Sequence, residues 1–314
     1  MIKLPMAGLL LAFLCAGPAH AGPMAYVPNE KSGTLSVVDT TSDRPAAAWT
    51  TGGRPRGIAV SPDGRRVYVS EQTRNVLLVL DAVTGEVQRS IALGESPQGL
   101  SLSNDGSLIA TASELGNAVV LVDVQRGERI AVVPTEGKSP EQAVFSPDGR
   151  WLYVSAEDGM QLDVVDVAAR RQVTSIPVGR RPRGIAFSPD GSRAYVACEL
   201  DAALYVIDVQ RHQVLQRIEA GEFSNSVAVH PDGRTVFVSS GRGASVSVID
   251  ATSGRTTAEI AVGQRPWSMA LTPDGRKLYV ANSRSNSVSV IDTDSRKRIA
   301  DIPVGELPWG VAIR

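Results

Sequence analysis

Short apolar segments alternate with turn-forming residues along the chain. In one copy of this pattern the segments are Gly57–Val60, Val67–Val69 and Val76–Leu80. These segments are too short for helices and are bounded by Pro and Gly, so they predict β-strands. Their consecutive apolar positions are typical of strands that are covered on both faces. A fourth segment, Glu86–Leu93, is more polar and alternates, as an outer strand would.

The four-segment pattern returns with a fixed step. The glycine of the turn after the first segment stands at Gly64, Gly106, Gly149, Gly191, Gly233 and Gly275. The aspartate that ends the third segment stands at Asp39, Asp81, Asp123, Asp166, Asp208, Asp250 and Asp292. The step is 42 residues, with one step of 43 between Asp123 and Asp166. This period is typical of solenoids, propellers and arrays. We expect the seven aspartates to cap turns rather than to form a carboxylate cluster.

The two ends of the repeat region complement each other. The last copy, Gly305–Arg314, stops after its first strand, and the first copy, from Ala25 to Asp39, lacks that strand. Together they make one blade, which closes a ring and leaves no open sheet edge. The sequence therefore predicts an all-β, seven-bladed β-propeller of four-stranded antiparallel blades, with the last blade closed by both termini. The repeats make residues 22–314 a single domain.

The N-terminal residues have the pattern of a secretory signal peptide. Lys3 supplies the positive charge, Met6–Cys15 is the apolar core, and Ala19-His20-Ala21 fits the small-x-small cleavage site. We predict a signal peptide over residues 1–21, cleavage near Ala21, and a mature protein in the periplasm or secreted. No stretch is long and apolar enough to predict a membrane span.

Composition narrows the classes of partner. Among 314 residues the formal net charge is −1, which gives no push toward nucleic acid or an anionic membrane. Removal of the signal peptide leaves one cysteine, Cys198, so no disulfide forms within the chain. We expect a half-buried thiol there, with a reactive or cross-linking thiol as the alternative in an oxidising compartment. We expect a monomer.

The loops divide between two rims because strand direction alternates within each blade. The Pro-Asp-Gly turns and the aspartate turns share one rim, which is nearly identical from copy to copy. The opposite rim varies, and a site built on a rigid frame is expected there. The residue after the proline position that opens each first strand is predicted to line the mouth of the central channel. These seven residues are Arg56, Gln98, Glu141, Arg183, Asn225, Trp267 and Trp309.

The predicted channel-mouth residues mix aromatic, cationic and amide groups. Arginine suits carboxylate or phosphate groups, and tryptophan suits a flat ring. The set therefore favours a site for a small organic ligand. The alternative is that these side chains only plug and solvate the channel mouth. A secondary rim in the loops after the second strands consists of Glu30, Gln72, Glu114, Glu157 and Glu199. It is either a solvated rim or a site for a cation or a basic partner.

The repeat motifs permit a comparison with a known family. Copies of Pro-x-Gly-Ile-Ala-x-Ser-Pro-Asp-Gly, with Leu278–Ser283 and Asn286–Asp292, resemble the YVTN-repeat β-propeller family over essentially all of residues 22–314. Tyr26–Asp39 and Val304–Val311 are similar to periplasmic propellers associated with PQQ-dependent alcohol catabolism. That resemblance implies an exported accessory protein without an assigned reaction.

Two functions remain open from the sequence. The first is an exported binding or interaction protein, whose partner is an unknown small molecule or a periplasmic protein at the Trp/Arg-lined mouth. The alternative is a lactonase-like hydrolase, in which Glu141 and Asn225 hold a divalent cation such as calcium that polarises a carbonyl. His212 is expected in an outer strand and His230 in a turn on the invariant rim, so neither would reach the channel mouth, and no Ser-His-Asp set is available.

Other classes are disfavoured. The chain has no Cys-x-x-Cys-His motif and no adjacent cysteine pair, which argues against a haem protein or quinoprotein. We therefore predict no resident cofactor and no metal ligands beyond the calcium alternative. Nucleic acid is an unlikely partner, because the glutamates of the secondary rim oppose the arginines and tryptophans that would bind a single strand.

Overall fold

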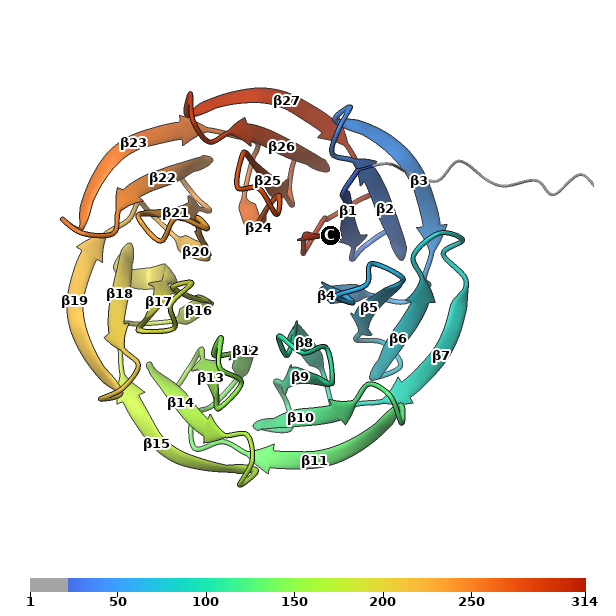
Figure 1. The fold of residues 1–314 in the computed structure, drawn as a ribbon, viewed down its shortest axis with the longest axis horizontal. Coiled ribbons are helices and arrows are strands. Elements are labelled where there is room, and N and C mark those ends of the chain that lie inside the picture. Colours follow the sequence, from blue (N-terminus) through green and yellow to red (C-terminus); the bar gives the residue numbers. More distant parts are fainter. Residues whose placement is uncertain (1–21) are drawn as a thin grey trace, which may run out of the picture.

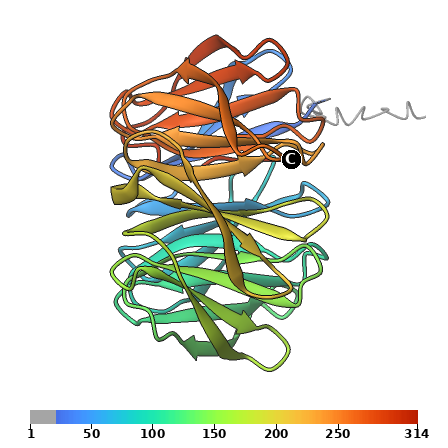
Figure 2. The same cartoon turned by 90° about the vertical axis from the view of Figure 1, so that its left-hand side faces the viewer.

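A computed structural model describes residues 22–314, so the expected signal peptide lies outside the described residues. The described chain forms seven sheets of four antiparallel strands, arranged in a ring around a central axis (Figure 1). Figure 2 shows the same ring from its edge, with the blades side by side. The seven-bladed all-β propeller is confirmed. Within residues 22–314, no helix is long and apolar enough to cross a membrane.

The innermost strand of each blade faces the central axis, and the second strand pairs with it on the outer side (Figure 1). The innermost strands are β4 (Pro55–Val60), β8 (Pro97–Leu102), β12 (Pro140–Phe145), β16 (Pro182–Phe187), β20 (Ser224–Val229), β24 (Pro266–Leu271) and β28 (Ala312–Ile313). The second strands are β1 (Met24–Asn29), β5 (Arg66–Glu71), β9 (Leu108–Ser113), β13 (Trp151–Ala156), β17 (Arg193–Cys198), β21 (Thr235–Ser240) and β25 (Lys277–Asn282).

The outer half of each blade follows the same order. The third strands are β2 (Thr34–Asp39), β6 (Val76–Asp81), β10 (Ala118–Asp123), β14 (Gln161–Asp166), β18 (Ala203–Asp208), β22 (Ser245–Asp250) and β26 (Ser287–Asp292). The fourth strands are β3 (Arg44–Thr50), β7 (Val87–Ala92), β11 (Glu128–Pro134), β15 (Arg171–Pro177), β19 (Gln213–Glu219), β23 (Arg255–Ala261) and β27 (Lys297–Pro303). One short 3₁₀ helix, η1 (Glu199–Asp201), follows β17. Second and third strands are buried on both faces and fourth strands are largely exposed, as the sequence pattern predicts.

Both termini close the ring. Strand β28 pairs antiparallel with β1, so the last blade has the order β28-β1-β2-β3. The backbone N–H of Met24 donates to the carbonyl of Arg314 at 2.9 Å, and the N–H of Arg314 donates to the carbonyl of Met24 at 3.1 Å. Strand β28 is only two residues long. The chain before it is held by a hydrogen bond from the N–H of Trp309 to the carbonyl of Pro28 at 2.9 Å. This segment carries Trp309 to the channel mouth.

Tyrosines at one position of the second strands join neighbouring blades. Tyr68, Tyr153, Tyr195 and Tyr279 are all fully buried there. The hydroxyl of Tyr153 lies 2.7 Å from Nδ1 of His212 in the next blade. His212 lies in the turn before β19. The sequence pattern predicted it within an outer strand, and that prediction is wrong by the strand boundary. Burial lowers the pKa of His212, which favours the neutral ring in this blade-to-blade contact.

The turn rim follows the predicted chemistry. Oδ1 of Asp81 accepts hydrogen bonds from the backbone N–H groups of Val83 and Thr84, both at 2.9 Å. These bonds to the charged form lower the pKa of Asp81. The aspartates that end the other third strands also accept hydrogen bonds from backbone N–H groups in their turns. These seven carboxylates therefore cap turns, as expected.

Cys198 is more deeply buried than its place in the sequence pattern predicts. It is the last residue of β17 and is 0% exposed, rather than half-buried. Burial raises the pKa of its thiol to about 12. Since the thiolate is the nucleophilic form, this burial disfavours the alternative of a reactive or cross-linking cysteine.

Candidate functional site

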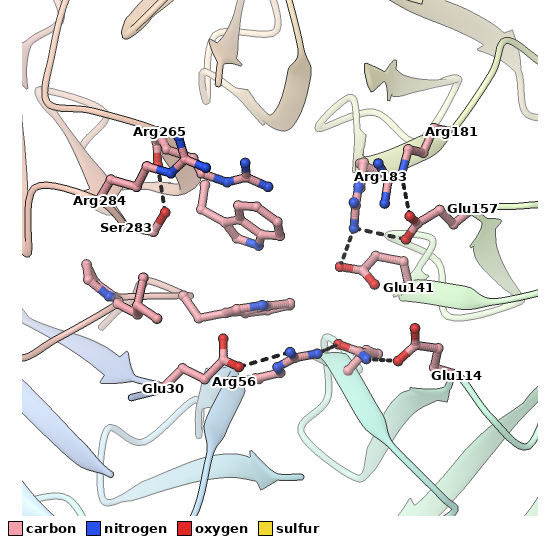
Figure 3. A pocket seen from close by; sticks show the side chains of 15 residues that line it. Glu30, Arg56, Glu114, Glu141, Glu157, Arg181, Arg183, Arg265, Ser283 and Arg284 are labelled. Atoms are coloured by element: carbon pink, nitrogen blue, oxygen red, sulfur yellow. Dashed lines mark hydrogen bonds and ion pairs between the residues drawn. The ribbon is translucent and has the colours of Figure 1, made fainter. Parts of the chain in front are cut away.

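The loop rim contains a cavity of about 480 Å³ at the channel mouth (Figure 3). Its walls include the second residue of five innermost strands and the segment before β28. Six of the seven predicted channel-mouth residues line it, namely Arg56, Gln98, Glu141, Arg183, Trp267 and Trp309. The seventh, Asn225 on β20, lines a smaller cavity of about 210 Å³ instead. Both cavities are lined by Arg265 and Arg284, so they adjoin.

The predicted secondary rim divides among three cavities. Glu30, Glu114 and Glu157 line the large cavity. Glu199 lines the small cavity beside Asn225. Gln72 lies apart, in a third cavity of about 480 Å³. The side-chain amide of Gln72 donates to the hydroxyl of Ser96 at 2.7 Å, which ties it to the neighbouring loop. The predicted channel-mouth residues and the predicted secondary rim therefore line the same two cavities over most of the mouth. Gln72 lines neither of these two cavities.

Arg183 is the centre of a buried ion-pair cluster. Its Nη1 lies 3.0 Å from Glu141 and 3.0 Å from Glu157, and its Nε lies 2.9 Å from Glu199. Figure 3 shows the Arg183 side chain directed toward Glu141 and Glu157. Burial lowers the pKa of Arg183, but the three carboxylates outweigh burial and raise it. Arg181 also pairs with Glu157 and lies 3.4 Å from Glu199. The guanidinium groups thus balance the acids of this wall.

Glu141 is buried beside Arg183. It is 6% exposed, and burial raises its pKa, whereas the Arg183 charge opposes that rise. A carboxyl group with a raised pKa can hold or accept a proton near neutral pH. Glu141 therefore has an environment that suits a general acid or base.

A second ion-pair cluster lies across the mouth. Nη2 of Arg56 lies 3.0 Å from Oε1 of Glu30, and Arg54 pairs with the same oxygen. Arg56 also donates to the side-chain carbonyl of Gln98, whose amide donates to Glu114. Figure 3 shows this row, from Glu30 through Arg56 to Glu114, along one wall. These contacts hold the side chains of the row in place, although Nε of Arg56 is buried without a hydrogen-bond partner in the described part of the chain.

The two tryptophans form an apolar wall. The ring centroids of Trp267 and Trp309 are 6.4 Å apart, with an angle of 46° between the ring planes. Trp309 is 7% exposed, and Trp267 is partly exposed. Cζ of Arg265 lies 4.6 Å from the Trp267 ring centroid, and Cζ of Arg183 lies 5.3 Å from it. Aromatic surface and guanidinium groups therefore meet at this wall, which suits a flat ligand with polar substituents.

Several lining residues were not among the predicted site residues. Arg181, Arg265 and Leu307 precede the proline of their copies and line the large cavity. Their φ angles are +60°, +53° and +54°, a left-handed backbone that side chains rarely adopt. Their shared position, directly before the proline, is the sequence feature that could have identified them as lining residues. Arg284 lies in the loop after β25, next to Ser283, and only the fold reveals that this loop reaches the mouth.

The residues of the cavity do not fit the calcium site that the lactonase alternative requires. Over residues 22–314, no group of three or more His, Cys, Asp or Glu side chains could hold a metal ion. Glu141 and Asn225, proposed as calcium ligands, line different cavities, and Glu141 is paired with Arg183. Calcium prefers several oxygen ligands. These residues do not fit such a coordination shell. His230 follows β20 on the turn rim, away from the cavity, as predicted.

Comparisons with known proteins agree with the fold. Hydrazine synthase of Kuenenia stuttgartiensis is similar, with a TM-score of 0.76 and 23% identity, over 82% of this chain and 89% of that chain. A functionally unknown protein from Desulfotomaculum acetoxidans DSM 771 is similar, with a TM-score of 0.82 and 18% identity, over 92% of this chain and 98% of that chain. At these identities the likeness shows the fold alone.

Sequence comparison places the chain in a family. A search among curated proteins found no match. The family model described as "Lactonase, 7-bladed beta-propeller" matches residues 24–129 and 168–299, which is more than half of the chain. The chain therefore belongs to the seven-bladed β-propeller lactonase family.

Proposed function

We propose that this protein is an exported, accessory binding protein that holds a small organic molecule with a flat ring at the channel mouth. The observation that carries the proposal is the convergence of Trp267 and Trp309 on a cavity of about 480 Å³. Cavities that hold small ligands are commonly of this size and combine apolar walls with a few placed polar groups. Aromatic side chains bind flat rings through stacking and burial of apolar surface.

The state of the cavity acids favours binding over chemistry. Glu141, Glu157 and Glu199 all pair with Arg183, and Glu30 pairs with Arg54 and Arg56. Paired carboxylates keep their charges balanced and their positions fixed, which suits recognition of a ligand shape. The plugging role that the sequence left open is disfavoured, because a cavity remains at the mouth.

Export and the accessory role rest on the sequence. The signal-peptide pattern of residues 1–21 supports export, and the resemblance of Tyr26–Asp39 and Val304–Val311 to periplasmic YVTN-repeat propellers supports the accessory role. Cell fractionation of the full chain and of a variant lacking residues 2–21 checks export. We expect the full chain outside the cytoplasm, shortened at its N-terminus, and the deletion variant inside.

The binding role can be tested with a neutral, flat fluorescent probe, N-phenylnaphthylamine. We expect the protein to bind it and Trp267→Ala to weaken binding by about tenfold or more, because the variant loses a large apolar contact. Trp267→Phe keeps a ring and should retain part of the affinity. Trp49→Phe, in the outer strand β3, is the matched control and should bind like the parent protein. Equal affinity in Trp267→Ala and the parent would contradict the proposed site.

Lactone hydrolysis is a second candidate, favoured by the family match and by the environment of Glu141. In this case the Glu141 carboxylate would accept a proton from water as the water attacks the lactone carbonyl, and a nearby guanidinium would stabilise the developing oxyanion. The ring C–O bond would then break as Glu141 returns the proton to the leaving ring oxygen, which gives the open hydroxy acid. A panel of lactones assayed with calcium and with a chelator tests it. Turnover that Glu141→Gln abolishes would support hydrolysis, and turnover that requires calcium would restore the metal-dependent alternative. Absence of turnover over the panel would contradict it.

A further inference from the structure

One sector of the mouth carries arginines that lack the carboxylate partners found elsewhere. Arg265 and Arg284 line both cavities, and neither forms an ion pair with a carboxylate among residues 22–314. Arg242 lines the small cavity and lies 4.0 Å from Glu222, where both side chains are more than 60% exposed. Such an exposed pair contributes little. We call Arg242, Arg265 and Arg284 the arginine arc.

The remaining mouth arginines are balanced. Arg183 contacts three carboxylates, Arg181 contacts two, and Arg56 contacts Glu30. Arg265 has the opposite environment. Burial lowers the pKa of Arg265, the Glu199 charge opposes that shift, and the charges of Arg284, Arg183 and Arg181 add to it. Like charges that lie close together repel one another. A bound anion would remove this repulsion.

Aromatic rings hold two members of the arc in place. Cζ of Arg242 lies 4.4 Å from the ring centroid of Phe223, and Cζ of Arg265 lies 4.6 Å from that of Trp267. Stacking on a ring leaves the N–H groups at the edge of a guanidinium free to bind a carboxylate, sulfonate or phosphate. In Figure 3, Arg265 and Arg284 lie side by side, across the cavity from Arg183 and Glu141.

The small cavity gives the arc an enclosed shape. Its volume is about 210 Å³, and the side chains of Asn225 and Gln264 add amide groups to its wall. Glu199 also lines it, but this carboxylate is occupied by Arg183 at 2.9 Å and Arg181 at 3.4 Å. The space suits one anionic group, and it adjoins the large cavity at Arg265 and Arg284.

We propose that the arginine arc is an oxyanion subsite and that the ligand is an organic anion with an aromatic ring. The ring lies against Trp267 and Trp309 in the large cavity, and a carboxylate, sulfonate or phosphate group lies in the small cavity against the arc. This inference rests on the proposed binding function and adds the chemical class of the ligand.

A matched pair of dyes tests the inference. Anilinonaphthalene sulfonate carries a sulfonate on the same ring system as N-phenylnaphthylamine, which is neutral. We expect the anionic dye to bind the parent protein more tightly and to weaken as salt rises. Arg265→Ala and Arg284→Ala should each weaken the anionic dye by about tenfold more than they weaken the neutral dye, because charge-assisted hydrogen bonds to the sulfonate are lost. Arg242→Ala should have a smaller effect of the same kind.

Controls separate the possible failures. Arg255→Ala, at the exposed start of β23 in the same blade as Arg242, removes an arginine far from the mouth and should leave both dyes unchanged. If both dyes bind equally and the arc variants bind like the parent, the oxyanion subsite is wrong while the tryptophan site stands. If neither dye binds to the folded protein, the binding function fails and the subsite fails with it. Circular dichroism of each variant verifies folding.

Discussion

The two sides of the channel mouth balance their arginines in different ways. On the side formed by β12 and β16, Arg183 contacts three glutamates and is 5% exposed. On the side formed by the loops before β24 and after β25, Arg265 stacks on the ring of Trp267 and Arg284 lines the large cavity. Neither arginine has a carboxylate partner among the described residues. The repeat supplies the same backbone to both sides. The difference teaches that one backbone frame can carry arginines that are neutralised within the fold on one side and arginines without such partners on the other, where we propose that the ligand binds.

The largest expected effect comes from breaking the paired side. Arg183→Met leaves three buried or half-buried carboxylates without their shared partner, and loss of one member of a buried ion pair costs about 3–5 kcal/mol. We expect a large fall in the free energy of unfolding, measured by urea denaturation. Arg181→Met, which removes a more exposed arginine from the same cluster, should cost clearly less. A stability of Arg183→Met equal to that of the parent would show that the cluster does not stabilise the fold.

Breaking the unpaired side should affect binding without loss of stability. Arg265→Ala removes a charge that neighbouring arginines repel, so we expect an unchanged or slightly raised melting temperature. The same variant should bind the anionic dye about tenfold more weakly. Thermal unfolding and dye titration on one preparation measure both quantities. A marked drop in melting temperature would mean that Arg265 belongs to the structural frame, and the contrast between the two sides would disappear.

The pH dependence of stability sharpens the comparison through Glu141. Its pKa is raised above the ordinary 4.5, so the folded protein binds this proton more tightly than the unfolded chain does. The stability that this group contributes is present below pH 4.5 and is lost as pH rises toward the raised pKa. The glutamine in Glu141→Gln cannot ionise. The melting temperature of this variant should therefore fall less than that of the parent as pH rises above 4.5. Glu86→Gln, at an exposed position away from the mouth, is the control for the Glu-to-Gln substitution itself.

The smallest effect is expected from unpairing an arginine on the balanced side. Glu30→Gln removes the partner of Arg56, which already lines the large cavity. We expect a stability loss of under about 1 kcal/mol, because Arg54 and part of the site are exposed to solvent. Affinity for the anionic dye should rise by about twofold to threefold, since one more cation becomes available. An unchanged affinity would indicate that the charge of Arg56 does not contribute to binding of the anionic dye.

Much of the site could be predicted because the repeat assigns equivalent positions. Once Arg56, Arg183 and Trp267 are known to occupy one place in successive blades, closure of the ring brings them to one mouth. Asn225 was expected with them and lines the adjoining cavity instead. Arg265 was missed as a site residue because its orientation depends on a φ of +53° before a proline. A residue before proline normally adopts an extended backbone, so propensity rules do not reveal this turn.

Other differences from expectation have local causes. Cys198 ends a second strand, where loops begin, yet neighbouring blades cover it completely. His212 belongs by pattern to an outer strand, but it lies in the turn before β19 and reaches Tyr153 of the adjacent blade. Both outcomes depend on contacts between blades, which are distant in sequence.

The sequence alone determined the number of blades, their strand order and their closure, because a fixed period of turns and apolar segments admits one ring and leaves half a blade at each end. It also determined the turn caps, since an Asp side chain bonds the backbone two or three residues on, within the same segment. Tertiary structure decided which charges are paired. Arg183 meets Glu141, Glu157 and Glu199 only because two blades present them at one height. Within the arginine arc, Arg265 and Arg284 form no ion pair with a carboxylate among the described residues, because Glu199, which lines the same small cavity, is paired with Arg183 and Arg181 instead.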